Sequence, residues 1–227
     1  MMDITFIGGG NMATAIIGGL CRLPDTHIRV VEPGADKRAM LAERFGVTPL
    51  EEPPAAWSAD CIVVLAVKPQ QLKAVCATLA PRLQGALVVS IAAGVDVATL
   101  SRWLGGSERI VRVMPNTPAQ IGAGMAVLSP NSAVTGEQLE LAARLMGAVG
   151  EVLVLPESRQ DAVTAVSGSG PAYVFYLAEA LTEAGVQVGL TRQQADKLAR
   201  QTIIGSARLL AAGEHPTVLR ERVTSPG

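Results

Sequence analysis

The chain has 227 residues, of which 49% are hydrophobic and 17% charged, and its formal net charge is −1. The hydrophobic fraction is large enough for one large core or two modest ones. The near-neutral charge and the 3% of aromatic residues argue against a surface that steers and stacks nucleic acid. The longest apolar runs, residues 61–67 and 86–95, fall short of the roughly 20 residues that a membrane helix needs.

The first strand is expected at Ile4–Ile7, so close to the first residue that we expect no leader peptide before it. Extended and helical patterns then alternate along the chain. We expect strands at 27–32, 61–67, 86–93, 109–114, 124–130 and 151–156, and helices at 11–23, 36–45, 70–79, 96–104 and 136–147. This alternation is typical of an open, doubly wound, mostly parallel α/β sheet.

The pattern changes after Pro156, where we expect helices alone: one from about Ser158, one over 172–186 and one over 192–212. We therefore predict two domains, 1–156 and 157–227. The helix after Pro171 is apolar nearly all round, which predicts that a second copy of the chain covers it. A core helix covered within its own chain is the alternative.

The first strand runs into "GGGNMA", Gly8 to Ala13, which fits the G-x-G-x-x-A pattern of a Rossmann-type dinucleotide-binding turn. Gly8 permits the sharp turn, Gly10 permits the close approach of a pyrophosphate, and Ala13 lets the following helix pack on the sheet. Free N–H groups at the start of that helix attract phosphates. We expect residues 1–156 to bind a dinucleotide; a tight turn without a ligand is the alternative.

Glu32 lies 22 positions after Gly10, near the roughly 20-residue spacing of the acid that binds a dinucleotide's ribose. A carboxylate there accepts hydrogen bonds from ribose hydroxyls and repels a 2′-phosphate, which favours NADH over NADPH. Lys37 and Arg38 follow and could instead reach a phosphate; their alternative is an ordinary solvated helix.

Three further loops are expected at the carboxyl ends of strands, where such sheets bind ligands. They are "AVKPQ" (66–70), "IAAG" (91–94) and "MPNTPA" (114–119). The small Ala92 and Ala93 would let a nicotinamide or ribose lie against the backbone, and Asn116 offers an amide. For each loop taken singly, turn chemistry is the alternative.

The "SGSGP" segment, residues 167–171, precedes the apolar helix and offers hydroxyl and N–H groups to an anion such as a carboxylate. Capping of that helix by Ser167 or Ser169 is the alternative. The three cysteines, an odd number without CxxC spacing, indicate free thiols in a reducing cytosol, with a disulfide or a metal site as the alternative. With only two histidines in the chain, we expect no metal site.

Taken together, "FIGGGNMA", "AVKPQ", "SIAAGV", "MPNTPA", "SGSGPAYVF" and "GEHP…VTSPG" resemble pyrroline-5-carboxylate reductase along the whole chain. The resemblance implies reduction of 1-pyrroline-5-carboxylate to L-proline by NADPH or NADH, the last step of proline biosynthesis, in the cytoplasm. It also implies a Rossmann domain followed by an all-helical dimerisation domain, with dimers that sometimes build a larger ring.

The resemblance and the residue patterns together give a candidate site. The predicted cofactor-binding residues are Gly8, Gly10, Asn11, Met12, Ala13, Glu32, Ala66, Val67, Lys68, Pro69, Ala92, Ala93 and Asn116. The predicted substrate-binding residues are Ser167, Ser169, Gly170, Thr224 and Ser225. We assign no catalytic residue, because the family's substrate-contacting threonine follows "SPG" and would lie beyond Gly227; the helical domain is therefore expected to be truncated.

Hydride transfer to a C=N bond that is already protonated needs little acid–base machinery, which agrees with the lack of a plausible catalytic His or Cys. Two alternatives stay open. A related imine or hydroxyacid reductase would need a lysine in the helical domain, where Lys197 is the only one. A non-catalytic NAD(P)-binding regulatory or vitamin-B6-handling protein would bind the cofactor without turnover.

Overall fold

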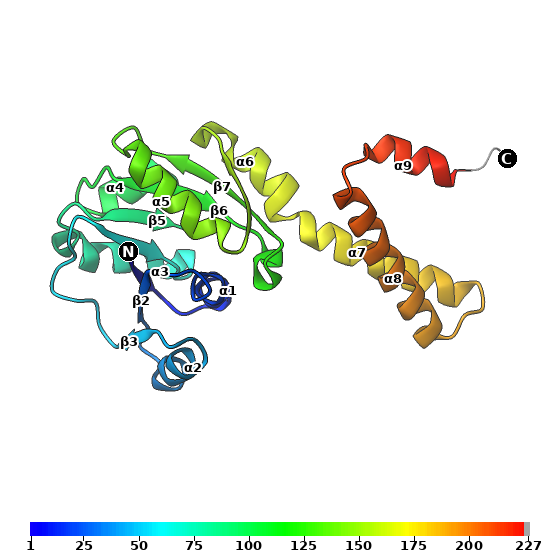
Figure 1. Ribbon diagram of the computed structural model, residues 1–227, viewed down its shortest axis with the longest axis horizontal. Coiled ribbons are helices and arrows are strands. Elements are labelled where there is room, and N and C mark those ends of the chain that lie inside the picture. The colour runs from blue at the N-terminus through cyan, green and yellow to red at the C-terminus, as the bar shows by residue number, and fades with distance from the viewer. Residues whose placement is uncertain (225–227) are drawn as a thin grey trace. The chain divides into compact units, whose positions relative to one another are not determined.

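The computed structural model describes residues 1–224, and it divides into two compact units, Met1–Ser169 and a helical unit that begins at Gly170 (Figure 1). The first unit contains an eight-stranded sheet in the order β3-β2-β1-β4-β5-β6-β7-β8. Its strands are β1 (Met2–Ile7), β2 (Thr26–Val31), β3 (Thr48–Leu50), β4 (Cys61–Leu65), β5 (Leu87–Ser90), β6 (Ile110–Met114), β7 (Gly124–Pro130) and β8 (Gly150–Val154).

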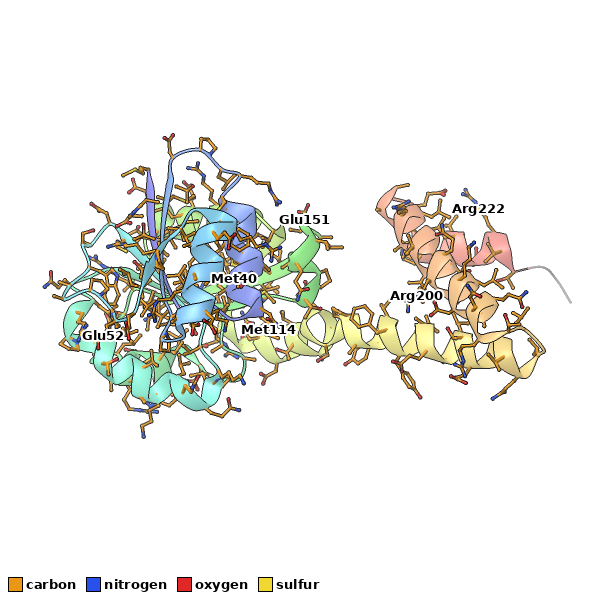
Figure 2. All side chains as sticks on the ribbon, turned by 90° about the horizontal axis from the view of Figure 1, so that it is seen from below. Met40, Glu52, Met114, Glu151, Arg200 and Arg222 are labelled. Carbon is orange, nitrogen blue, oxygen red and sulfur yellow. The ribbon has the colours of Figure 1, made fainter. Side chains whose placement is uncertain are left out.

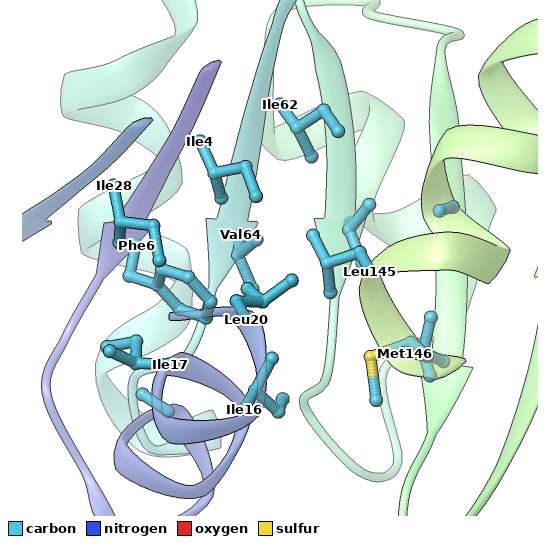
Figure 3. Packing of buried hydrophobic residues seen from close by; sticks show 14 of the residues in the cluster. Ile4, Phe6, Ile16, Ile17, Leu20, Ile28, Ile62, Val64, Leu145 and Met146 are labelled. Atoms are coloured by element: carbon cyan, nitrogen blue, oxygen red, sulfur yellow. The ribbon is translucent and has the colours of Figure 1, made fainter. Parts of the chain in front are cut away.

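Helices cover both faces of this sheet, as the alternating pattern predicts. They are α1 (Asn11–Leu20), α2 (Ala35–Phe45), α3 (Pro69–Leu79), α4 (Val97–Trp103) and α5 (Gly136–Gly147). On one face, Ile4 and Phe6 of β1 pack with apolar residues of α1 and α5 (Figure 3). On the other face, Val63 and Leu65 of β4 pack with α3 and α4. The doubly wound α/β fold is thereby confirmed.

The sheet is parallel except where β7 runs antiparallel to β6. Only residues 115–123, which include the 3₁₀ turn Thr117–Ile121, join these two strands. A parallel crossover needs a dozen or more residues, so this short connection reverses the chain direction. The helix α5 then supplies a crossover of ordinary length, and β8 returns parallel to β7.

Several elements differ from the expected bounds. The strands β4 and β5 end at Leu65 and Ser90, earlier than expected, because the residues that follow them turn off the sheet and form the loops of the site. The strand β3 was not expected, since it has three residues and contains Pro49. Proline is tolerated there because β3 is an edge strand.

The segment after β8 packs on the sheet. It consists of a 3₁₀ turn (Glu157–Arg159), α6 (Gln160–Val163) and a π-helical turn (Thr164–Gly168). Gln160 is buried, and its Nε2 donates hydrogen bonds to Ser129 Oγ at 2.8 Å and to the Val127 carbonyl at 3.2 Å. The compact units therefore divide after Ser169, and a functional boundary near residue 156 stays a prediction.

The second unit contains α7 (Gly170–Gln187), α8 (Arg192–Ala211) and α9 (Pro216–Val223), of which α9 was not expected. The helices α7 and α8 pack against each other, and a Cβ on Gly185 would lie 2.9 Å from the Ala195 Cβ. Along α7, Tyr173, Phe175 and Tyr176 expose 60%, 61% and 72% of their surface in the single chain. Within residues 1–224, no helix has the length and apolar character to cross a membrane.

Candidate functional site

The predicted cofactor residues converge on one edge of the sheet. Because β1, β2, β4, β5 and β6 are parallel neighbours, their carboxyl ends lie along the same edge. The loops that follow these strands contain most of the predicted cofactor-binding residues, and the others begin the helices that come next: Asn11, Met12 and the buried Ala13 lie in the first turn of α1, and Pro69 is the first residue of α3. This edge is where open α/β sheets bind ligands.

The glycine turn between β1 and α1 is packed against the loop after β4. Gly8 has a φ of +98°, and a Cβ there would lie 3.0 Å from both the Ala66 carbonyl oxygen and Val67 Cγ1. Glycine is therefore required at this position by conformation and by packing. The contact also brings together two segments that the sequence separates by more than fifty residues.

The start of α1 is open to a ligand. Gly10 precedes the helix, and the nearest atom to a Cβ built there is the Ala66 carbonyl oxygen at 3.8 Å. Among the described residues, no side chain caps this helix start. The N–H groups of Asn11 and Met12 therefore remain available to an anion, which is the arrangement that a pyrophosphate needs.

Glu32 follows β2 and is held by two backbone donors. The Gly9 N–H donates to Oε2 at 3.0 Å, the Gly34 N–H donates to Oε1 at 3.1 Å, and Lys37 Nζ lies 3.6 Å from Oε2. Partial burial raises the pKa of Glu32, but the two N–H donors and the lysine outweigh it and hold the pKa below its usual range. Glu32 is thus a fixed carboxylate beside the glycine turn.

Gly9 contacts the candidate site at Glu32, a contact that was not predicted from the sequence. A Cβ on Gly9 would lie 2.7 Å from Leu41 Cδ1, so the Leu41 side chain of α2 fills the space beside it. The Gly9 N–H donates to Glu32. The run of three glycines was the available signal.

The two cations near Glu32 have different partners. Arg38 donates to the carbonyls of Glu32 and Pro33 at 2.8 and 2.7 Å, whereas Lys37 pairs with the Glu32 carboxylate.

The loop after β5, which contains Ala92 and Ala93, is tied to β6 by an ion pair that the sequence did not indicate. The Val97 N–H at the start of α4 donates to Glu157 Oε1 at 2.8 Å. Arg112 Nη1 of β6 donates to the same oxygen at 3.0 Å, and only 11% of the Arg112 side chain is exposed. Glu157 therefore joins the end of this loop, through Val97, and the strand β6, through Arg112, to the segment that leads to Ser167.

Asn116, in the loop after β6, contacts a predicted substrate residue. Its Oδ1 accepts a hydrogen bond from the Met125 N–H at 2.8 Å, and its Nδ2 donates to the Ser167 carbonyl at 3.2 Å. The structure therefore brings Asn116 and Ser167 together. Ser169 lies in the same unit, and its N–H donates to the Thr164 carbonyl at 2.8 Å.

The other predicted substrate residues lie elsewhere in the chain. Gly170 begins the second unit, and Thr224 ends the described part of that unit, where its Oγ1 donates to the Arg220 carbonyl at 2.8 Å. Ser225 lies outside the described residues. Of the predicted substrate residues, Ser167 is therefore the one that the structure shows in contact with a predicted cofactor loop, through Asn116.

Within residues 1–224, no three His, Cys, Asp or Glu side chains are placed so that they could share a metal ion. The cysteines are free thiols, with Cys61 and Cys76 buried and Cys21 exposed. Burial raises the pKa of Cys76 to about 11, so this thiol stays protonated at neutral pH.

Comparisons with known proteins identify the family of this chain. Residues 157–227 match the family described as pyrroline-5-carboxylate reductase dimerisation, and residues 3–94 match the family described as NADP oxidoreductase, coenzyme F420-dependent. The pyrroline-5-carboxylate reductase of Pseudomonas aeruginosa is 48% identical, over 98% of this chain and 84% of that protein. The Escherichia coli enzyme of the same name is 43% identical, over 99% and 85%.

Solved structures show the same relationship. A pyrroline-5-carboxylate reductase from Coxiella burnetii superimposes with a TM-score of 0.90 at 43% identity, covering 100% of this chain and 86% of that one. The Plasmodium falciparum pyrroline carboxylate reductase, solved with NADP bound, superimposes with a TM-score of 0.81 at 29% identity, covering 100% and 85%.

Proposed function

Because this chain belongs to the pyrroline-5-carboxylate reductase family, we propose that the carboxyl edge of its sheet binds NAD(P)H and presents it to the substrate. The chain is an enzyme of proline biosynthesis that reduces 1-pyrroline-5-carboxylate to L-proline. The observation that supports the proposed site most strongly is the open start of α1, where uncapped N–H groups adjoin a glycine turn.

Three groups of residues hold the cofactor in this proposal. The N–H groups of Asn11 and Met12 bind the pyrophosphate, Glu32 accepts hydrogen bonds from the adenosine ribose, and the loops 66–69 and 91–94 line the nicotinamide half. The fixed orientation of Glu32 between two N–H donors and the small side chains of the second loop support these roles. When bound, NAD(P)H supplies the hydride.

In this proposal the chain's own residues orient the substrate and exclude water, and none of them has to move a proton. A protonated imine becomes a neutral amine on receiving a hydride, so no side chain has to supply a proton during that step. The residues must instead hold the imine carbon within about 3.5 Å of the hydride donor. Ser167, hydrogen-bonded to Asn116 at the same edge of the sheet, is the proposed contact for the substrate's carboxylate.

The helical part of the chain is a dimerisation domain. The exposed aromatic residues of α7 are the surface that a second copy would cover, since a single chain leaves them in water. A ring of such dimers, and a cytosolic location inferred from three free thiols, stay predictions.

The site proposal is tested by exchanging Gly10 for alanine. The φ of −68° at Gly10 is accessible to any residue, and a Cβ there meets no atom closer than 3.8 Å, so the fold should tolerate it. The added methyl group would nevertheless lie on the pyrophosphate's approach. We expect Gly10→Ala to weaken NADPH and NADH binding by about tenfold, which is about 1.4 kcal/mol, with little change in thermal unfolding.

Gly136→Ala is the matched control, because Gly136 lies at the start of another helix, α5, and a Cβ there meets no atom within 4 Å. Binding is measured by the fluorescence of the reduced nicotinamide, and turnover by the loss of its absorbance when 1-pyrroline-5-carboxylate is added. Unchanged affinity in Gly10→Ala would place the pyrophosphate elsewhere. Binding without turnover in the wild-type protein would favour the non-catalytic alternative.

A further inference from the structure

The orientation of the Asn116 side-chain amide is fixed by its partners. The Met125 N–H only donates, so the Asn116 atom 2.8 Å from it is the acceptor, Oδ1. The Ser167 carbonyl only accepts, so the atom 3.2 Å from it is the donor, Nδ2. Both contacts demand the same orientation, and a flipped amide would lose both.

This orientation decides what the Ser167 hydroxyl can do. Asn116 Nδ2 lies 3.5 Å from Ser167 Oγ and approaches it as a donor, on the acceptor side of the hydroxyl. The hydroxyl hydrogen must then point away from Asn116. In the part of the chain that the structure describes, no acceptor receives it, so the hydroxyl is free to donate to a ligand. A donor is what a carboxylate requires.

The turn that contains Ser167 also rests on the end of β6. It is a π-helical turn, closed by the hydrogen bond from the Ser169 N–H to the Thr164 carbonyl, and such turns occur frequently at functional sites. A Cβ on Gly168 would lie 2.4 Å from Met114 Cε, so Met114, labelled in Figure 2, packs directly against the backbone there. Met114 and Asn116 therefore fix the turn from the same strand end.

We propose that Asn116 is a positioning residue for substrate binding, and that it acts through Ser167. Asn116 holds the Ser167 hydroxyl with its hydrogen directed at the carboxylate of 1-pyrroline-5-carboxylate. This gives Asn116 a role other than the cofactor contact expected from the sequence. The inference rests on the proposed function, since it presupposes that the substrate lies beside Ser167.

The test uses the full chain with Asn116→Asp, Ser167→Ala and the double variant. Aspartate keeps the shape of asparagine and still accepts from the Met125 N–H, but its carboxylate cannot donate to Ser167. Ser167→Ala removes the hydroxyl and leaves the backbone carbonyl in place. Asn131→Asp is the matched control, because Asn131 also accepts from a backbone N–H (Ser132) and donates to a carbonyl (Glu108).

Each single variant is expected to raise the KM for 1-pyrroline-5-carboxylate about 10- to 100-fold, as loss of a hydrogen bond to a charged group does. The kcat should change by less than about threefold, and the Kd for NADPH should not change. The double variant should be no worse than the more damaged single variant, because both act on one hydroxyl. Asn131→Asp should match the wild type.

The outcomes separate this inference from the proposed function. If Ser167→Ala leaves the KM for the substrate unchanged, the proposed substrate site itself is wrong. If Ser167→Ala raises that KM but Asn116→Asp does not, or if the two effects multiply, Asn116 does not act through Ser167. A weaker Kd for NADPH in Asn116→Asp alone would restore the cofactor role. Should Asn116→Asp not fold, Asn116→Ser is measured against the same criteria.

Discussion

Replacing Glu32 by glutamine should change the enzyme's preference between NADPH and NADH. The exchange keeps the size of the side chain and removes its charge. We predict that the wild-type enzyme uses NADH at least as well as NADPH, because a fixed carboxylate at this position repels a 2′-phosphate. In Glu32→Gln that repulsion is lost. The glutamine amide has only one acceptor oxygen, so either the Gly9 N–H or the Gly34 N–H will face its NH2 group and lose a hydrogen bond.

The size of the effect follows from Coulomb's law. Two unit charges about 5 Å apart repel by roughly 0.8 kcal/mol in bulk water and by roughly 3 kcal/mol near a protein surface. Only 13% of the Glu32 side chain is exposed, which strengthens the repulsion, but Lys37 lies 3.6 Å away and compensates part of the charge. We therefore expect about 1–2 kcal/mol, which raises the ratio of kcat/KM for NADPH over NADH about 5- to 30-fold.

Steady-state kinetics with each coenzyme at saturating 1-pyrroline-5-carboxylate measures this ratio. The matched control is Glu51→Gln, since Glu51 also pairs with a cation of α2, Arg38, but its side chain is 72% exposed. The control should leave the ratio within about twofold. A wild-type enzyme that strongly prefers NADPH, combined with an unchanged ratio in Glu32→Gln, would show that Glu32 does not lie at the ribose.

Four further changes have defined outcomes. Gly8→Ala, with a φ of +98° and a Cβ 3.0 Å from two atoms, should lower the free energy of unfolding by about 1–3 kcal/mol; an unchanged Tm would contradict the packing argument. Glu157→Gln should cost about 1–3 kcal/mol in urea unfolding and raise the KM for NADPH, because Arg112 loses its charged partner; equal stability would mean that solvent replaces the pair. Phe175→Asp should yield monomers in sedimentation, whereas intact dimers would place the interface away from α7. Because the pKa of Glu32 is lowered by folding, its carboxylate stabilises the enzyme above the unfolded value of about 4.5, and this contribution is lost as pH falls through the folded pKa. The stability difference between wild type and Glu32→Gln should therefore shrink below about pH 4.5 in urea titrations, and a difference that grew there would reverse the sign of the argument.

Much of the fold could be predicted from the sequence because its signals are local. Extended patterns of four to eight residues, each followed by glycine or proline and then a helical pattern, give the succession of strands and helices along the chain and place the strands' loops on one edge. The link between β6 and β7 is too short for a parallel crossover, but that these two strands are neighbours in the sheet is seen only in the structure. The strand β3 could not be predicted, since edge pairing with β2 outweighs the low propensity of Pro49.

The site could be predicted in outline but not in its connections. Asn116 was expected to contact the cofactor, because the sequence shows a polar residue after a strand and not its partner Ser167, 51 positions later. The pair between Arg112 and Glu157 was missed for the same reason, since charged residues 45 positions apart give no periodic signal. Such contacts depend on tertiary packing, which no local pattern reports.

The double grip on Glu32 constrains how this protein can be re-engineered or can evolve. Its two oxygens accept from the amides of Gly9 and Gly34, so the side chain that we propose as the ribose contact also braces the glycine turn that we propose as the pyrophosphate site. A lineage that changes coenzyme by losing this acid must find another acceptor for both amides. Coenzyme swaps should therefore succeed as paired exchanges in which a hydroxyl or amide side chain arrives together with the new cation.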